Sequence, residues 1–245
     1  MREMAVNGQT LPISYHKALT ALHSFGEEVP CPDYNTSQKE ISMTMVVESP
    51  LAEPMISRLM IAGPRELEQY RQEMLDGILD FEIARGNWPY TYHDRINYQI
   101  PFVVAELRRN PHTRRAVINV RSASDLESDD PACLQHIQYF IRDGRLHCKV
   151  LFRSNDACKA TFMNAFALIM LQKRITEELG VEMGTYTHRA NSFHCYESDY
   201  SLLDSYAARY AGRKDTTYFY EGDWEEQMED AKPEIAAMVE ALRNG

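Results

Sequence analysis

The stretch DPACLQHIQYFIRDGRLHCKVLFRSND, residues 130–156, predicts two strands joined by a tight turn. Residues 134–141 and 146–152 mix aromatic and aliphatic side chains with polar ones, in the near-alternating pattern of half-buried strands. Between them, Asp143-Gly144 is a strong signal for a hairpin turn. The sequence therefore predicts an antiparallel pair of strands in this region.

Helices and further strands flank this hairpin on both sides. The longest predicted helix covers residues 155–179 and ends at Gly180, a favourable C-terminal cap. The other predicted helices cover residues 16–25, 64–85, 98–109, 199–211 and 223–243, and the other predicted strands cover residues 41–48, 116–120 and 185–196. Strands and helices alternate without a linker, so we expect one mixed α+β domain over residues 1–245.

The composition argues against several classes of protein. A net charge of −10 disfavours a nucleic-acid binder with a general basic surface, although a few arginines can still focus positive potential on a small anionic ligand. The five cysteines are an odd number without CxxC spacing, which indicates a reduced, intracellular protein. The sequence has no apolar run of the roughly 20 residues that span a bilayer and no signal-peptide pattern, so we expect a cytoplasmic protein that does not bind membranes. Paired zinc-ligand spacings, a P-loop and dinucleotide-binding glycines are also missing, so we expect no metal.

Two arginine-containing segments are candidates for anion binding. Arg114 and Arg115 open one predicted strand, whereas Arg153 and Ser154 end another. Guanidinium groups bind phosphate with two parallel hydrogen bonds, and a serine hydroxyl adds a further donor. Taken alone, each pair is more commonly a set of surface salt-bridge partners in an acidic chain.

Other polar side chains also have both a structural and a functional interpretation. Asn164 lies among apolar residues of the longest helix, where a carboxamide either bonds within the core or faces a ligand. His194 and Tyr196 would share one face of a strand. Glu66 in a first helical turn is either a partner of the helix dipole or a general base. Cys133 follows two aspartates that oppose a thiolate, so it is either a packing residue or a nucleophile supported by positive charge from elsewhere.

The order of these pieces resembles the catalytic half of thymidylate synthase and its relative deoxycytidylate hydroxymethylase. The resemblance rests on DPACLQHIQ, RSND, the helix that carries Asn164, and SFHCY, with NPHTRR, ELEQY and WPYTYHDRI upstream. The matching residues are Glu66, Tyr92 (with Tyr90 as its rival), Arg114, Arg115, Cys133, Gln138, Arg153, Ser154, Asp156, Asn164, His194 and Tyr196. The resemblance covers roughly residues 60–210. It implies a mixed, largely antiparallel twisted sheet with a long central helix and flanking helices.

The resemblance implies folate-dependent transfer of one carbon to C5 of a pyrimidine deoxynucleoside monophosphate. The Cys133 thiolate, favoured by the Arg153 guanidinium, would attack C6, and 5,10-methylene-tetrahydrofolate would be the co-substrate. The resemblance also implies that the phosphate is bound by Arg114, Arg115, Arg153 and Ser154, and that the sugar 3′-hydroxyl is bound by His194 and Tyr196. Gln138 would lie in the pyrimidine pocket, and Asp156 would contact the folate ring. Catalytic roles are implied for Glu66, Tyr92 and Asp156. In the family the arginine pair comes from the other subunit, which implies an obligate homodimer.

Asn164 bears on the choice of base. Its carboxamide can pair with N3–H and O4 of uracil, which favours dUMP and methylation to dTMP, although a flipped amide could pair with cytosine. The family's N-terminal phosphate loop is missing, with Lys39 as a weak substitute, and the chain ends in MVEALRNG without an apolar tail to cover the folate. Without a tail, water could enter the folate site and capture the transferred carbon, and Asp130 points the same way. The second hypothesis is therefore 5-hydroxymethylation of dUMP or dCMP. A catalytically silent nucleotide-binding homologue is the third.

Overall fold

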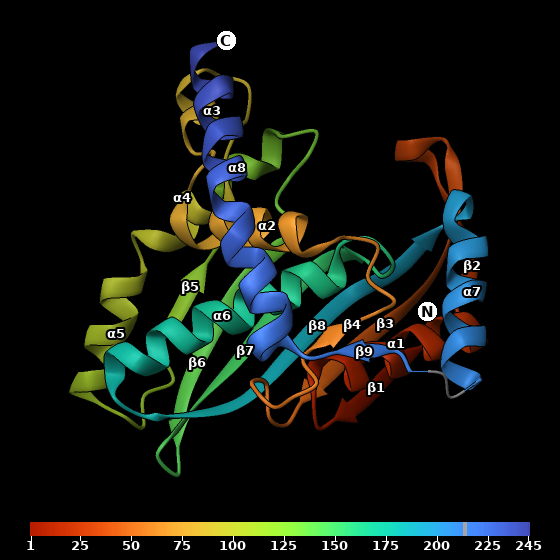
Figure 1. Ribbon diagram of the computed structural model, residues 1–245, viewed down its shortest axis with the longest axis horizontal. Helices are drawn as coiled ribbons and strands as arrows, with labels where there is room; N and C mark the ends of the chain where they lie inside the picture. The colour runs from red at the N-terminus through yellow and green to blue at the C-terminus, as the bar shows by residue number, and fades with distance from the viewer. Residues whose placement is uncertain (213–214) are drawn as a thin grey trace.

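The computed structural model describes residues 1–212 and 215–245, and within them one seven-stranded sheet forms the centre of the molecule (Figure 1). Its strands are β1 (Glu3–Gly8), β2 (Glu27–Cys31), β3 (Thr36–Val47), β5 (Val117–Asn119), β6 (Leu134–Arg142), β7 (Arg145–Asp156) and β8 (Glu182–Tyr196). They lie in the order β1-β3-β8-β7-β6-β5, with β2 also paired to β3. The pairs β1/β3 and β7/β8 are parallel and the others are antiparallel. The mixed, largely antiparallel sheet is therefore confirmed.

The described part of the chain also contains eight α-helices. They are α1 (Leu11–Phe25), α2 (Pro64–Asp76), α3 (Phe81–Ala84), α4 (Tyr92–Asn97), α5 (Ile100–Arg109), α6 (Thr161–Leu179), α7 (Tyr200–Ala211) and α8 (Glu225–Asn244). A small second sheet pairs β4 (Ile56–Ser57) with β9 (Thr217–Tyr218). Among the residues described, no helix is both long and apolar enough to cross a membrane.

The β6–β7 hairpin forms as the sequence predicts. Asp143 and Gly144 have φ angles of 51° and 74°, so both adopt the left-handed conformation that a two-residue hairpin turn requires. On β6, the side chains of Leu134, Ile137 and Tyr139 are buried in the core. The turn chemistry and the alternation of burial thus fix the register of the strands that lead into the site.

Helix α6 is the central helix, but it begins at Thr161 rather than at residue 155. Residues up to Asp156 continue β7 instead, because they pair with β8 as far as Asp156 opposite His194. The hydroxyl of Thr161 then donates to the main-chain oxygen of Asp156, and Gly180 ends the helix at a φ of 66°, as predicted. The segment Arg153–Asp156 is therefore the end of a strand and not a turn before a helix.

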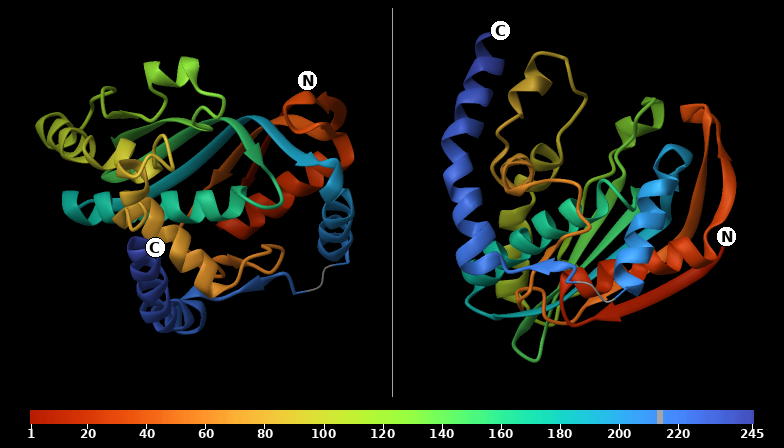
Figure 2. Two further views of the ribbon diagram at one scale, coloured as in Figure 1. Left: turned by 90° about the horizontal axis from the view of Figure 1, so that it is seen from above. Right: turned by 45° about the vertical axis from the view of Figure 1, so that its right-hand side comes forward.

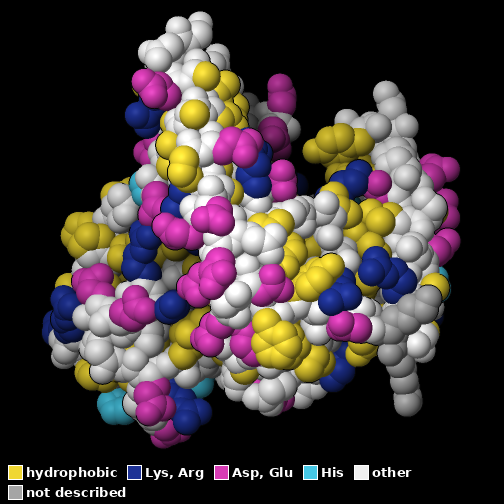
Figure 3. Space-filling model, viewed as in Figure 1, with side chains coloured by type: hydrophobic (Ala, Val, Ile, Leu, Met, Phe, Trp, Pro, Cys, Tyr) yellow, Lys and Arg dark blue, Asp and Glu magenta, His cyan; other side chains and the backbone are white. Residues whose placement is uncertain are grey.

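The helices form two layers on one face of the sheet (Figure 2). Helices α1 and α6 lie directly on the sheet, and α2 and α8 lie outside α6. The helix predicted over residues 64–85 is divided, because Gly77 adopts a φ of 63° and ends α2 at Asp76. On the face shown in Figure 3, acidic and basic side chains are interspersed around α8.

The opposite face of the sheet carries polar side chains with some apolar ones among them. On β8 the outward side chains include Thr185, Thr187 and Arg189, and on β7 they include Lys149 and Leu151, all exposed or half-buried. These residues alternate along each strand with the buried residues that face α6. This face of the sheet is therefore accessible from solvent in the single chain.

Candidate active site

A pocket of about 520 Å³ opens where the ends of β7 and β8 meet α6. Eight of the side chains that the sequence predicts to act together line this pocket: Tyr92, Cys133, Arg153, Ser154, Asp156, Asn164, His194 and Tyr196. They come from four different elements and from the residue directly before β6. The strand order thus gathers into one cavity residues that are far apart in the sequence.

Cys133 lies half-buried at the start of β6, beside the end of β7. The Arg153 side chain holds the loop before it, since Nη2 donates to the carbonyl oxygen of Pro131 at 2.7 Å. Burial and the Asp130 charge raise the pKa of the Cys133 thiol, whereas the Arg153 charge lowers it. The net result is a pKa above the ordinary value of a thiol. Arg153 therefore acts in the expected direction, but without a ligand its effect is smaller than that of burial.

His194 lines the same pocket, and one of its ring nitrogens is buried without a partner among the described residues. Its side chain is buried, and burial lowers its pKa, so the ring is neutral near pH 7. Nδ1 lies 3.3 Å from the carbonyl oxygen of Ser192, which can only accept, and 3.4 Å from the Ser154 hydroxyl, so a proton on Nδ1 satisfies both contacts. In the described part of the chain Nε2 has no partner, which leaves it as a free acceptor. The rings of His194 and Tyr196 pack edge to face with 4.8 Å between their centres, as expected for two residues on one face of a strand.

Asn164 enters the pocket from α6 and makes a hydrogen bond that the sequence did not suggest. Its Oδ1 accepts from the hydroxyl of Tyr70, which lies on α2. Burial raises the pKa of Tyr70 well above its ordinary value, so the phenol stays protonated. Tyr70 is thus a site residue that the sequence analysis missed, although it belongs to the ELEQY segment that the resemblance singled out.

Tyr92 fits the pocket better than its rival Tyr90. The Tyr92 hydroxyl accepts from the main-chain amide of Leu134 at 3.3 Å, one residue after Cys133. Tyr90 does not line this pocket and instead lies under the Arg95 guanidinium, 3.8 Å from the ring centre. Burial raises the pKa of Tyr92, and it raises the pKa of Tyr90 to about 12, so both phenols are protonated at neutral pH.

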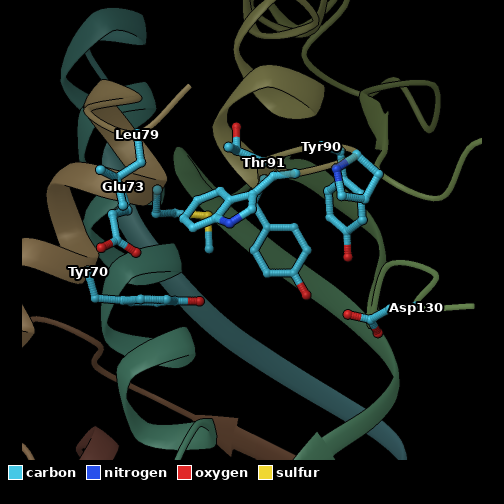
Figure 4. A pocket seen from close by; sticks show the side chains of 10 residues that line it. Tyr70, Glu73, Leu79, Tyr90, Thr91 and Asp130 are labelled. Carbon is cyan, nitrogen blue, oxygen red and sulfur yellow. The ribbon is translucent and has the colours of Figure 1, made fainter. Parts of the chain in front are cut away.

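A second pocket of about 350 Å³ adjoins the first and shares Tyr70 and Tyr92 with it. Its other lining residues are Glu73, Met74, Leu79, Trp88, Pro89, Tyr90, Thr91 and Asp130. Figure 4 shows Tyr70 and Glu73 projecting from α2 on one side, with Tyr90 and Asp130 on the other. Burial raises the pKa of Glu73, and a hydrogen bond of 2.8 Å from Gln69 partly opposes this. This pocket combines an aromatic wall with two carboxylates.

Two residues expected in the pocket lie elsewhere. Glu66 is exposed at the N-terminus of α2, where its Oε2 accepts from the main-chain amide of Gly63 at 3.0 Å. This bond caps the helix. Glu66 does not line the pocket, since it lies one helical turn before Tyr70, which does. Gln138 belongs to the outward set on β6, and its Nε2 donates to the carbonyl oxygen of Arg114 at 3.0 Å. Neither side chain reaches Cys133 within this chain.

The predicted cationic residues divide into those inside and those outside the pocket. Arg153 is inside, whereas Arg114 and Arg115 are exposed beside a separate surface hollow before β5. Within residues 1–212 and 215–245, neither guanidinium forms an ion pair. Lys39 does not line the pocket and instead lies 4.9 Å from the ring centre of Tyr200.

The β2–β3 hairpin supplies pocket residues that sequence reasoning did not identify. They are Cys31, Asp33, Tyr34 and Gln38. The Tyr34 ring lies 5.4 Å from that of Tyr196, so the hairpin tip reaches the β8 side of the site. Pro30, Pro32 and Asn35 favour a turn in this hairpin, but the position of the hairpin over the site depends on the long-range pairing of β3 with β8.

Asp156 has one oxygen engaged by the main chain. Its Oδ1 accepts from the amides of Cys158 and Lys159, both at 2.9 Å. This arrangement shapes the turn between β7 and α6, and within the described residues Oδ2 makes no hydrogen bond. Among the described residues, no group of three or more His, Cys, Asp or Glu side chains is arranged to hold a metal ion.

Comparison with known proteins agrees with this geometry. The sequence model of the family described as thymidylate synthase matches residues 69–234. A putative thymidylate synthase of Methanocaldococcus jannaschii is 34% identical over 155 residues, which cover 59% of this chain and 69% of that protein. A thymidylate synthase of Bacillus mojavensis is 27% identical over 146 residues, or 58% of this chain and 51% of that protein. The solved structure of thermostable thymidylate synthase A from Bacillus subtilis has the same fold, with a TM-score of 0.65 at 16% identity over 81% of this chain and 84% of that chain. This chain therefore belongs to the thymidylate synthase family and has a function of the thymidylate synthase type.

Proposed function

We propose that this protein methylates dUMP to dTMP, with 5,10-methylene-tetrahydrofolate as the source of the carbon and of the hydride that reduces it. The observation that carries the proposal is that Cys133, Arg153, Asn164 and His194 line one pocket. These residues suit the four parts of a pyrimidine nucleotide. A nucleophile can attack the ring, and a cation can bind the phosphate. A carboxamide can pair with the edge of the base, and an imidazole acceptor can bind a sugar hydroxyl. Sγ of Cys133 would form a bond to C6, which moves electron density to C5, and this bond would break again when the product leaves.

Arg153 and Ser154 would bind the phosphate. Arg153 borders the cavity through the same side chain that bonds the loop before Cys133, so phosphate binding and nucleophile position would be linked. A bound phosphate dianion would be held by charge-assisted hydrogen bonds from the guanidinium and the serine hydroxyl. Nε2 of His194 would accept a hydrogen bond from the sugar 3′-hydroxyl, and Tyr196 would border the sugar.

The second pocket is suited to the folate. Its aromatic and apolar side chains would cover a flat ring system, and its shared wall with the first pocket would bring the transferred carbon beside C5 of the base. The free Oδ2 of Asp156 remains a candidate contact for the folate ring. Glu73, in this pocket, is better located than Glu66 to exchange the C5 proton, and its raised pKa suits an acid–base group.

We further propose a homodimer in which Arg114 and Arg115 reach the phosphate of the partner's site. Both are exposed, neither lines the pocket of its own chain, and both precede β5 at the edge of the sheet. The accessible sheet face would form the interface, and Gln138, which bonds to the main chain of Arg114, would lie in it. The five free cysteines support a location in the reducing cytoplasm.

One observation favours a second function. Asp130 lines the second pocket, which shares a wall with the pocket that Cys133 lines. A carboxylate there can hold water, and water that captured this carbon would give a 5-hydroxymethyl nucleotide instead of a methyl nucleotide. The second candidate is therefore hydroxymethylation of dUMP or dCMP.

Product analysis separates these functions. The purified protein is incubated with isotopically labelled dUMP or dCMP and methylene-tetrahydrofolate, and the nucleotide products are identified by mass spectrometry. We expect dTMP from dUMP, with dihydrofolate formed in equal amount. A hydroxymethyl product without dihydrofolate would support the second function, and no product with either nucleotide would indicate a silent homologue. A Cys133→Ser protein with full turnover would contradict the covalent route.

A further inference from the structure

The hydrogen bond between Tyr70 and Asn164 joins two helices at the boundary of the two pockets. Tyr70 lies on α2 and Asn164 on α6, and the phenol donates to Oδ1 of the carboxamide. Tyr70 lines both pockets, and Figure 4 shows its ring extending from α2 into the cavity region. The tyrosine therefore contacts a pocket side chain whose two ends, one an acceptor and one a donor, could distinguish uracil from cytosine.

This contact fixes the orientation of the carboxamide. In the described part of the chain the Tyr70 hydroxyl has no hydrogen bond other than the one to Asn164. If the amide were flipped, the phenolic proton would lose its acceptor in a largely buried place, which is costly. The stable arrangement has Oδ1 toward Tyr70, and Nδ2 takes part in none of the hydrogen bonds within residues 1–212 and 215–245. The free end that Asn164 offers to a ligand is thus a donor.

We propose that Tyr70 sets the choice of base by holding Asn164 in the orientation that presents its NH₂ group to the C4 substituent. Uracil carries an oxygen at C4, which accepts from the NH₂ group, whereas cytosine carries an amino group that would meet it donor to donor. Tyr70 is then a positioning residue for specificity, and it acts through Asn164. This inference rests on the proposed pyrimidine nucleotide site and adds the selection of uracil to it.

Removal of one hydroxyl tests the proposal. Equilibrium affinities of dUMP and dCMP are measured by calorimetry for the wild-type protein and for Tyr70→Phe, without folate. We expect the wild-type protein to favour dUMP, and Tyr70→Phe to reduce the dUMP-to-dCMP affinity ratio by roughly tenfold, because the amide is then free to flip. The ratio of kcat/KM values for the two nucleotides should fall in parallel.

Tyr139→Phe is the matched control. Tyr139 is a fully buried tyrosine on β6 whose hydroxyl has no partner in the described chain, and it lines neither pocket. Its removal should leave the affinity ratio unchanged, which separates loss of a buried hydroxyl from loss of the Asn164 contact. Thermal unfolding of each variant verifies that it is folded.

The outcomes of this experiment distinguish failure of the inference about Tyr70 from failure of the proposed pyrimidine nucleotide function. A Tyr70→Phe protein with the wild-type ratio would overturn the role of Tyr70 while leaving the nucleotide site intact. A wild-type protein that binds dCMP as well as dUMP, or better, would overturn it without any variant. A wild-type protein that binds neither nucleotide would overturn both the inference and the proposed function.

Discussion

The main-chain amide of Arg153 donates to the carbonyl oxygen of Cys133 across 2.8 Å, so the candidate nucleophile and its cation are joined through the backbone as well as by charge. The Arg153 side chain adds hydrogen bonds to the two preceding carbonyls, those of Pro131 and Ala132. The reactivity of the thiol is therefore set by three effects that can be changed separately, namely burial, the Arg153 charge and the Asp130 charge.

The first prediction concerns the pH at which Cys133 reacts. Its pKa is above the ordinary thiol value, so at pH 7.5 a smaller fraction is thiolate than in a free cysteine, and alkylation should keep rising above pH 9. Arg153→Gln removes the effect that lowers the pKa and should shift the profile upward, whereas Asp130→Asn should shift it downward. Mass spectrometry of the Cys133 peptide after timed iodoacetamide treatment measures this without interference from other cysteines. Equal profiles for the two variants would contradict the assigned causes.

The second prediction compares two glutamates on α2. Glu73→Gln should lower kcat by about 10²–10⁴-fold, the usual contribution of a positioned acid–base group. Glu66→Gln should retain nearly full activity, because glutamine can also serve in the capping interaction with Gly63. Steady-state kinetics on both variants, with urea unfolding to compare their stability, make this test. Loss of activity in Glu66→Gln with an active Glu73→Gln would reverse the assignment.

These two glutamates also illustrate how far the sequence could predict the site. The motifs around Cys133, Arg153 and His194 pointed to residues that line one pocket, because each lies at a strand end whose position follows from the sheet. The sequence could not show which of Glu66, Tyr70 and Glu73 lines the pockets, since this depends on how α2 packs against α6. A helix places neighbouring turns 5.4 Å apart, which is enough to move a side chain out of a cavity.

The fold shows the same division between local and long-range information. Asp143-Gly144 and Gly180 were read correctly because turn and cap chemistry is local. The end of α2 at Gly77 was missed, since helix-forming residues on both sides concealed it. The short parallel strand β1 was missed as well, because its partner β3 lies beyond the whole of α1.

The third prediction tests the exchange of arginines between subunits. Cys133→Ser and Arg115→Ala proteins should each be nearly inactive, and an unfolded and refolded mixture should recover about a quarter of wild-type activity, because half of the dimers are hybrids with one intact site. Light scattering should give the mass of two chains. The control is a refolded mixture of Cys133→Ser with Cys133→Ala, which cannot form an intact site. An inactive mixture of the first pair would show that Arg115 acts in its own chain or not at all.

The fourth prediction concerns stability in mild acid. Burial lowers the pKa of His16 to about 4 and that of His188 to about 3, both below the ordinary value of 6.5. Because the unfolded chain takes up protons at 6.5 and the folded one does not, unfolding becomes easier as the pH falls below 6.5, by about 1 kcal/mol per group and pH unit. Urea unfolding at pH 7.0, 6.0 and 5.0 should show this loss.

A variant assigns part of that pH dependence to a named residue. His16 is buried on α1 with its Nε2 2.7 Å from the hydroxyl of Ser57, so His16→Gln should flatten the dependence between pH 6.5 and 5. His112 is exposed, and His112→Gln should leave the slope as in the wild-type protein. Identical slopes for the His16 variant and the wild type would contradict the assignment.

The covalent step is tested most directly with a dUMP analogue that carries fluorine at C5. Fluorine cannot leave as a cation, so the adduct would accumulate once C5 has accepted the carbon from methylene-tetrahydrofolate. Mass spectrometry of the intact protein should show an increase equal to nucleotide plus co-substrate, located on the Cys133 peptide and missing in Cys133→Ser. An unmodified protein under saturating ligands, or an adduct on another cysteine, would contradict the account.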